Sequence, residues 1–506
     1  MRLWKSTFGK SHPSVCVAGV MVSTLLALLA ASTGQVLAAD FYVGGGGASD
    51  RNPGTATEPF ATIQKAANVA RPGDVVKIRD GVYRETVVPS GSGTEGNPIV
   101  FEADAGAEPV ISGADLVTTS WQPANHANLN SAYPIYETTI NLPPVEYISH
   151  DPAVTGNEVL MAQQVFVRGE MQQEARWPKV TDPEHPLKDH GYARARTIPS
   201  RGTDWDWIRE GNHIRLRDDG LPNVPGGLAG AHCTVLTWYV PACALILSSN
   251  GNEFLIDGDM PNADGHMQTR FTNWLTRVEK NGYPDNLLYY VRGALGLLTS
   301  EGEFYYDEST NKLYLWAPGG SVPENVEYKA RNWGFDLTGK SHIHIKHLNF
   351  FACEIPTNGD SLWPTNAKTW DAPQPPYATA KPTYASVQAK ADAQGYVAGA
   401  HPSDRNNPAA VPDPANGILI DYCRFKYLNH QTVMVAMPDN SPPGLELSET
   451  GMQQGNSNSN FGNLHRAGIR LTGDNCTIRN SVFDTASGSE VVVTGRNCTI
   501  ENNYFK

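Results

Sequence analysis

The chain nearly repeats itself at the end of its sequence. LTGDNCTIRNSVF at 471–483 is followed by VTGRNCTIENNYF at 493–505, and matching residues of the two copies lie 22 positions apart. An internal repeat of about 20 or more residues is typical of a solenoid, in which each unit stacks on the one before it. The repeat therefore predicts stacked coils with inward ladders of Cys, Ile and Phe. We expect Cys476 and Cys498 to be reduced neighbours in such a ladder.

The same pattern extends towards the N-terminus. ILIDYCRF at 418–425 aligns with CTIRNSVF at 476–483, which places Phe425 over Phe483 and makes Val433 the counterpart of Val491. KYLNHQT at 426–432 and DTASGSE at 484–490 then become equivalent turns in different coils. Because turns of a solenoid can vary while its stacked positions cannot, we expect any chemistry on this lateral face.

The beginning of the mature chain predicts an end cap. In FATIQKAANVARPGD, the residues Phe60, Ile63, Ala67 and Ala70 fall on one helical stripe that RPGD terminates. Short β-prone pieces separated by turns surround this stripe. A helix at this place would cover the exposed end of the stack, where a terminal coil otherwise offers unpaired backbone groups.

Together, the 22-residue coils and FATIQKAANVARPGDVVKIRDGVYRE resemble the pectin-lyase-like superfamily of right-handed β-helix proteins. EARWP at 174–178 and GEFYYDESTNKLYLWAPGG at 302–320 are similar to its glycoside-hydrolase-like members. The resemblance implies an all-β fold, a right-handed parallel β-helix (solenoid) with an N-terminal capping helix and a β-rich inserted region. It also implies a carbohydrate-active protein, although several carbohydrate chemistries share this scaffold.

We expect four segments along the chain. Residues 1–38 read as a signal peptide cleaved near Ala38, which predicts a secreted or periplasmic protein with no membrane segment after cleavage. Residues 40–113 would form the first coils and the cap, and 114–330 the inserted β-rich region. Residues 331–506 would form further coils with long loops at 354–416 and 438–463. No capping segment follows Phe505, so we expect this sequence to be a truncated product of a longer reading frame.

The formal net charge of −13 argues against nucleic acid as a partner. The expected partner is a polysaccharide, bound by a monomer. An anionic polysaccharide would need a local basic patch or a bridging cation. We predict no cofactor, with calcium as the exception if the protein is a lyase.

Glycoside hydrolysis requires two carboxyl groups across the scissile bond, about 5 Å apart for retention and about 6.5–9.5 Å for inversion. Adjacent coils of a β-helix lie about 4.8 Å apart, so carboxylates on neighbouring coils meet this requirement. Asp484 and Glu490 flank one lateral turn, and Asp421 lies on an earlier coil. The structural alternative is that Asp484 initiates the turn and Glu490 is a solvated rim residue.

A polysaccharide lyase would instead need a base and a cation beside a uronate carboxyl group. His430, His465 and Arg466 are candidates for catalysis near the same face, and Lys426 for catalysis or substrate binding, although such residues at turns are more often structural. The Lys and Arg spacing of the lyase families is absent, which favours hydrolysis. Trp363 and Trp370, in the long loop at 354–416, are candidates to pack against sugar rings. A non-catalytic carbohydrate-binding or adhesion protein is the third hypothesis.

Overall fold

A computed structural model describes the chain from residue 38 onwards, with gaps. The described residues are 38–142, 147–149, 158–161, 163–180, 193–197, 209–210, 213–236, 241–256, 287–331, 333–357, 415–428, 432–434, 469–471, 473–486, 491–493 and 497–505. The chain separates into two units, Met1–Ala39 and Asp40–Lys506. The predicted signal peptide lies almost entirely outside the described residues and stays a prediction. Within the described part, no helix is long and apolar enough to span a bilayer.

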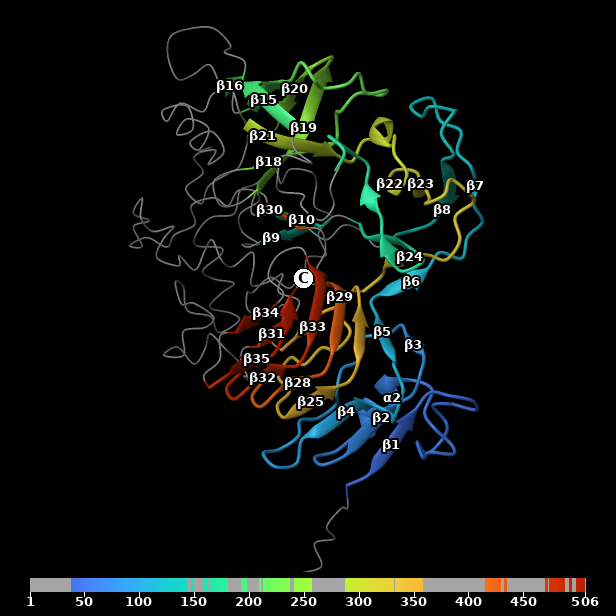
Figure 1. Cartoon of the computed structure of the whole chain (residues 1–506), viewed down its shortest axis with the longest axis vertical. Helices are drawn as coiled ribbons and strands as arrows, with labels where there is room; N and C mark the ends of the chain where they lie inside the picture. The colour runs from blue at the N-terminus through green and yellow to red at the C-terminus, as the bar shows by residue number, and fades with distance from the viewer. Residues whose placement is uncertain are drawn as a thin grey trace, which may run out of the picture. The chain divides into compact units, whose positions relative to one another are not determined.

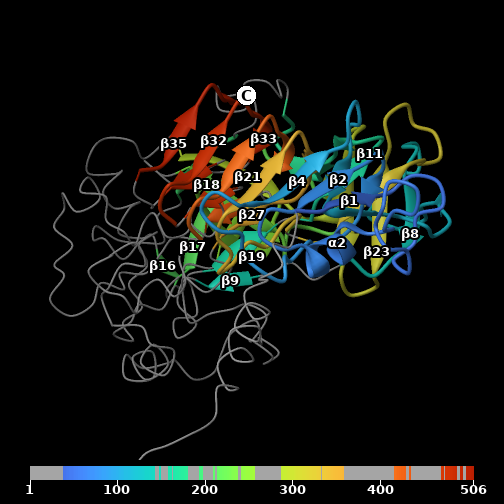
Figure 2. The same ribbon diagram turned by 90° about the horizontal axis from the view of Figure 1, so that it is seen from below.

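The described residues form an all-β structure in which three sheets are parallel throughout. The first has seven strands in the order β1-β2-β4-β25-β28-β32-β35, the second has six, β3-β5-β26-β29-β33-β36, and the third has three, β27-β31-β34. Figure 2 shows β1, β2 and β4 of the first sheet side by side. The strands of the first sheet are β1 (Asp40–Val43), β2 (Val75–Ile78), β4 (Ile99–Ala103), β25 (Ile343–Lys346), β28 (Leu419–Asp421), β32 (Thr477–Arg479) and β35 (Thr499–Glu501).

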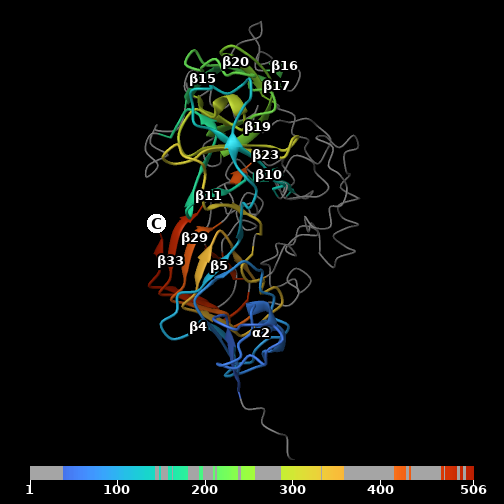
Figure 3. The ribbon, with the colours of Figure 1, turned by 90° about the vertical axis from the view of Figure 1, so that its right-hand side faces the viewer.

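Successive passages of the chain add strands to the parallel sheets in turn, and the passages that begin with β25 and β32 add one strand to each of the three sheets. β25, β26 and β27 follow one another along the chain and belong to the first, second and third sheet, and β32, β33 and β34 do the same. Figure 3 shows β5, β29 and β33 of the second sheet in one row. The second and third sheets comprise β3 (Val82–Tyr83), β5 (Val110–Ser112), β26 (Asn349–Phe351), β29 (Arg424–Leu428), β33 (Val482–Ala486) and β36 (Tyr504–Phe505), then β27 (Ile355–Pro356), β31 (Ile469–Leu471) and β34 (Val491–Val493).

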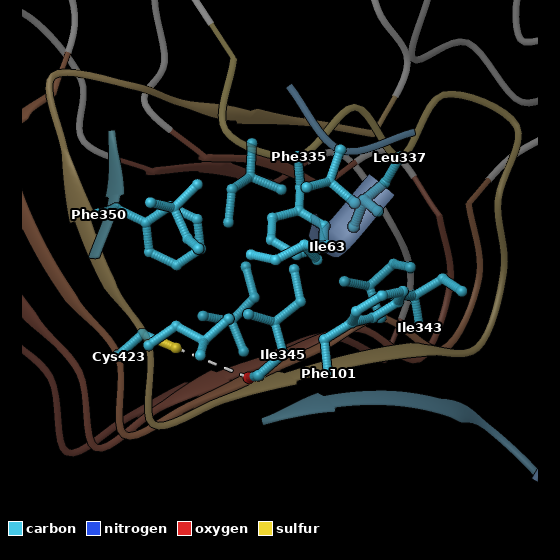
Figure 4. Packing of buried hydrophobic residues seen from close by; sticks show 14 of the residues in the cluster. Ile63, Phe101, Phe335, Leu337, Ile343, Ile345, Phe350 and Cys423 are labelled. Atoms are coloured by element: carbon cyan, nitrogen blue, oxygen red, sulfur yellow. Dashed lines mark hydrogen bonds between the residues drawn. The ribbon is translucent and has the colours of Figure 1, made fainter. Parts of the chain in front are cut away.

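The predicted register of the repeat is confirmed. Phe425 pairs with Phe483, which in turn pairs with Phe505, and Ile478 pairs with Ile500. The rings of the phenylalanines stack with centroids 4.9 Å and 4.7 Å apart, close to the spacing of neighbouring strands. Figure 4 shows part of the buried core cluster, which includes Phe425, Ile478 and Phe483, whereas Ile500 and Phe505 on the last strands are exposed. Cys476 and Cys498 are reduced thiols, as predicted.

Gly473, a glycine of the repeat, cannot be replaced by a larger residue for a steric reason. A β-carbon on Gly473 would overlap the backbone carbonyl of Ala415, which lies on the previous passage of the chain. Only glycine lets the two backbones approach so closely. The repeat is therefore constrained by the close approach of two backbones at Gly473 as well as by its inward side chains.

The predicted pairing of Val433 with the position of Val491 is wrong. Val433 lies in β30 (Thr432–Met434), which pairs antiparallel with β10 (Glu158–Met161) of the inserted region. The third parallel sheet instead takes Ile469, which pairs with Val491. An offset of eight residues from the phenylalanine therefore does not identify the third strand, because β30 pairs with the inserted region and the third strand, β31, begins only at Ile469.

The predicted amphipathic helix is confirmed as α2 (Ile63–Val69). The Thr62 side chain caps it by accepting a hydrogen bond from the Lys65 N–H at 3.1 Å. Ile63, Ala66 and Ala67 are buried in the same core cluster as β1 and β2. The helix therefore covers part of the stack near its first strands, as Figure 3 shows.

The inserted region consists mainly of antiparallel sheets. β6 (Ala114–Leu116) pairs with β24 (Val326–Lys329), so the two ends of the region meet. Two salt bridges of 2.6 Å stabilise the place where these ends meet, one between Arg331 and Asp115 and one between Arg84 and Glu327. Figure 1 labels its strands. The remaining elements are β7 (Gln122–Pro123), β8 (Tyr136–Thr139), β9 (Tyr147–Ser149), β11 (Val165–Val167), β12 (Glu170–Met171), β13 (Gln173–Glu174), β14 (Arg176–Trp177), β15 (Ala193–Thr197), β16 (Arg209–Glu210), β17 (His213–Arg217), β18 (His232–Leu236), β19 (Pro241–Asn250), β20 (Glu253–Ile256), β21 (Leu287–Arg292), η2 (Leu295–Leu297), β22 (Glu303–Asp307) and β23 (Lys312–Trp316).

The stacked phenylalanine rings allow a first prediction about the stability of the fold. Phe425→Ala removes a fully buried ring between two stacked neighbours, so we expect the free energy of unfolding to fall by about 3–5 kcal/mol. Arg424→Ala, one residue earlier and exposed, should change it by less than about 0.5 kcal/mol. Urea unfolding followed by circular dichroism tests both, and equal losses for the two variants would contradict the prediction.

Candidate functional site

The chain repeatedly leaves the parallel sheets at one edge, between the second and third sheets. After β5 it passes through the inserted region before Phe335 returns parallel to Val87. After β29 it passes through residues 429–468 before β31, and after β33 through residues 487–490 before β34. This edge is where strand ends of the stack meet residues of the inserted region. It corresponds to the lateral face on which the sequence predicts chemistry.

Lys426 and Asp484 are register neighbours at this edge, on β29 and β33. Each directly follows an inward phenylalanine, and because side chains alternate along a strand, both point out of the core. Both are half-buried. The spacing of parallel strands places their backbones about 4.8 Å apart.

Glu170 reaches the same edge from the β11–β12 hairpin of the inserted region. One of its carboxylate oxygens accepts a hydrogen bond from the Lys426 ammonium at 2.8 Å, and the other from the Tyr427 hydroxyl at 2.7 Å. The Tyr427 hydroxyl also accepts the Met171 N–H at 3.2 Å. We call Glu170, Lys426, Tyr427 and Asp484 the lateral cluster.

Tyr427 contacts Glu170 because its backbone departs from the regular strand. Its φ of 58° lies in the left-handed region, which is uncommon for an aromatic residue. Regular alternation would turn Tyr427 inward beside Phe425, but its ring instead packs on Phe166 and Phe351, with centroids 5.3 Å and 5.8 Å away. The strained conformation therefore lets two consecutive side chains, Lys426 and Tyr427, bind one carboxylate.

Both donors of the lateral cluster hold their protons tightly. Burial lowers the pKa of Lys426, but its hydrogen bond to Glu170 and its interactions with Tyr427 and the Glu170 charge together outweigh burial, and the pKa is raised overall. Burial also raises the pKa of Tyr427, and its hydrogen bond to Glu170 raises it further. Near neutral pH the two groups are therefore hydrogen-bond donors to a carboxylate, and neither is suited to act as a Brønsted base.

Asp421 lies in a different sheet from Asp484, at the end of β28 in the first parallel sheet. Its two oxygens accept hydrogen bonds from Arg479 and Asn480, each at 2.9 Å. Burial raises the pKa of the Asp421 carboxyl, but the bonds from Arg479 and Asn480 prevail and the pKa is lowered overall. Asp421 is thus a fixed carboxylate with both oxygens engaged.

Asp421 also belongs to a ladder of alternating charge. At one outward position of the first parallel sheet, residues paired in register change sign from each strand to the next. This ladder consists of Lys77, Glu102, Lys346, Asp421, Arg479 and Glu501. Opposite charges side by side stabilise strand pairing and like charges oppose it, so the ladder favours this register.

The other predicted site residues lie outside the described residues. These are Glu490, His430, His465, Arg466, Trp363 and Trp370. Among the described residues, no group of three or more His, Cys, Asp or Glu side chains is arranged to hold a metal ion. The roles of these residues, and calcium binding by a lyase, stay predictions.

Glu170 was not among the residues that sequence reasoning selected. It belongs to GEMQQEARWP, just before the EARWP motif, but its partners Lys426 and Tyr427 follow more than 250 residues later. No spacing rule connects residues so far apart. The sequence feature that could have indicated Glu170 is its position in the segment directly before EARWP.

The EARWP motif itself stabilises the inserted region. Glu174 forms a salt bridge with the buried Arg292, and the Arg176 guanidinium lies 3.9 Å from the centre of the Tyr290 ring. Nearby, the Lys179 ammonium donates to the buried Glu303 carboxylate at 2.6 Å. These contacts tie β13 and β14 to β21 and β22, so the motif joins neighbouring sheets of the region.

Comparisons with known proteins give distant similarities. No family model matches the chain. It is 34% identical over 110 residues to the uncharacterized protein YwoF of Bacillus subtilis (strain 168), a match covering 21% of this chain and 24% of that protein. A solved glycoside hydrolase aligns with 89% of this chain and 74% of its own at 17% identity and a TM-score of 0.49. The complex of XylC with xylose aligns with 92% of this chain and 54% of its own at 17% identity and a TM-score of 0.30. The GH136 lacto-N-biosidase from Eubacterium ramulus aligns with 92% of this chain and 41% of its own at 9% identity and a TM-score of 0.26.

The ion pair between Asp421 and Arg479 predicts that the free energy of unfolding depends on pH. Because the folded-state pKa of Asp421 is lowered, its contribution to stability is present above the unfolded pKa of about 3.9 and is lost as the pH falls through the folded pKa. Asp421→Asn should therefore destabilise the protein at pH 7, and the difference from wild type should shrink as the pH falls below about 4. Urea unfolding across pH tests this, with Glu501→Gln at the exposed end of the ladder as the control. A difference independent of pH would contradict it.

The Glu170–Lys426 salt bridge should contribute little to folding. The side chains are 68% and 34% exposed, so we expect a coupling free energy below about 1 kcal/mol. A double-mutant cycle of Glu170→Gln and Lys426→Met, measured by urea unfolding, gives this value. A coupling of several kcal/mol would show that the pair mainly supports the fold, and activity losses of these variants would then be uninformative.

Proposed function

We propose that the three parallel sheets are the faces of a right-handed parallel β-helix of the pectin-lyase-like type. The support is that the passages beginning with β25, β28 and β32 each contribute a strand to all three sheets in turn, with equivalent residues in register. Parallel crossover connections are right-handed in about 98% of cases. In this proposal residues 40–113 and 331–506 supply the coils, and 114–330 form the inserted region.

We further propose that the protein is a secreted glycosidase that hydrolyses a polysaccharide at the lateral cluster. One observation carries the proposal: Glu170 and Asp484 come from distant segments and both lie next to Lys426, which binds the first and is the register neighbour of the second. Glycoside hydrolysis requires two carboxyl groups brought close together in this way.

The two carboxyl groups have different surroundings. Glu170 accepts hydrogen bonds from an ammonium and a phenol, which favour its ionised form, and it remains 68% exposed. We assign it the role of nucleophile or of the base that activates water. Asp484 then supplies the proton to the leaving oxygen, and Lys426 and Tyr427 position Glu170.

Elimination is less well supported by this cluster. A lyase needs a group that removes a proton near neutral pH, and the raised pKa values of Lys426 and Tyr427 oppose that role. By contrast, the Glu170 carboxylate, to which Lys426 and Tyr427 donate, is one of the two carboxyl groups that hydrolysis requires. The cluster therefore favours hydrolysis over elimination.

Incubation of the full chain with a panel of plant, algal and host polysaccharides tests the proposal. We expect new reducing ends without the ultraviolet absorbance of an unsaturated uronate. Asp484→Asn and Glu170→Gln should each lower kcat by roughly 100-fold or more. Glu95→Gln, an exposed carboxylate in another part of the fold, should leave kcat unchanged.

Three other results would overturn the proposal. Unsaturated products would identify a lyase, and binding without any product would identify a carbohydrate-binding or adhesion protein. Full activity of both Asp484→Asn and Glu170→Gln would show that hydrolysis occurs elsewhere on the protein.

A further inference from the structure

The turn between the first and second parallel sheets carries a second ladder, formed by backbone conformation. His347, Tyr422, Asn480 and Asn502 occupy equivalent positions, directly after four members of the charge ladder, and their φ angles are 56°, 53°, 53° and 52°. The Tyr422 N–H donates to the Arg479 carbonyl at 3.3 Å, and the His347 and Asn480 N–H groups donate in the same way to the next strand. The position therefore requires a left-handed residue, which asparagine adopts more readily than other residues with a β-carbon.

Two of these four positions hold aromatic residues instead of asparagine. The rings of His347 and Tyr422 stack, with centroids 5.1 Å apart and planes 10° from parallel. Both residues are exposed, and Tyr422 retains 55% of its accessible surface. An exposed aromatic pair in a strained conformation does nothing for the turn that asparagine would not do with less strain, which points to a role outside folding.

Polar groups border this pair. Arg479 binds Asp421, the residue before Tyr422, through one guanidinium nitrogen, and 41% of the Arg479 side chain is exposed. The Asp421 carboxylate has both oxygens engaged and its side chain is only 8% exposed, so it is not accessible for acid–base chemistry. An aromatic face bordered by hydrogen-bond donors is suited to a pyranose ring, whose C–H face can pack on aromatic rings while its hydroxyls accept hydrogen bonds.

We propose that His347 and Tyr422 form a binding platform for a pyranose residue of a polysaccharide. The inference rests on the proposed function, because it assumes a carbohydrate partner. β29 begins just after Tyr422 and ends at the lateral cluster, and its five residues span about 13 Å from first to last. The platform therefore binds sugar beyond the cleavage site and retains the polysaccharide without cleaving it.

The test replaces both aromatic residues by the residue that neighbouring turns use. The double variant His347→Asn/Tyr422→Asn should keep its melting temperature within about 3 °C of wild type, because asparagine suits the backbone. In native gels containing xylan, mixed-linkage β-glucan or polygalacturonate, we expect at least one neutral polysaccharide to retard wild type. The variant should bind that polysaccharide roughly tenfold more weakly. Hydrolysis of short soluble oligosaccharides made from it should be unchanged.

Tyr504→Asn is the matched control, because Tyr504 is also an exposed tyrosine but lies outside the left-handed ladder. It should migrate like wild type. Equal retardation of wild type and the double variant would overturn the inference, as would retardation by polygalacturonate alone that salt abolishes. Absence of retardation of wild type in every gel would also overturn it. Retardation of wild type without any cleavage would instead contradict the proposed hydrolysis and leave the platform intact.

Discussion

Parallel pairing in register is the constraint on which the rest of the structure depends. Once Phe425 lies beside Phe483, Arg424, Lys426 and Leu428 of β29 are also placed beside their counterparts in β33. The inward positions become ladders of like apolar residues, and the outward positions must avoid ladders of like charge. The first parallel sheet meets that second condition by alternating basic and acidic residues from strand to strand. One register thus satisfies the core and the charged surface together.

The parts of the fold that obey this periodicity could be predicted from the sequence. The 22-residue offset identified the partners of Ile478 and Phe483, and a helical stripe ended by RPGD identified α2. The place of Val433 could not be predicted in this way. Periodicity describes only residues that return to the stack, and β30 pairs with the inserted region before the chain returns at Ile469.

Only the residues of the candidate site that belong to the parallel sheets could be predicted from the sequence. Asp484 and Lys426 were found because they begin the two segments, predicted to be turns, that differ between similar repeats, although both residues lie within strands, β33 and β29. Glu170 comes from a hairpin of the inserted region, where no repeat operates, and its contacts depend on tertiary packing. Asp421 shows the opposite case, since it has the residue type expected of a catalyst, but its side chain is only 8% exposed and Arg479 and Asn480 engage both of its oxygens.

The left-handed residues show how such a regular scaffold accommodates features that its periodicity does not provide. A strand that alternates strictly cannot direct two consecutive side chains to one carboxylate, and Tyr427 does so because its φ of 58° turns it out of the core. Its ring then packs on Phe166 of the inserted region, and its hydroxyl binds Glu170. The free-energy cost of about 1–2 kcal/mol for a left-handed residue is offset by that buried packing. At Tyr422 the same conformation has no buried packing to offset it, and for that reason binding of an outside ligand is the better explanation of the aromatic side chain there.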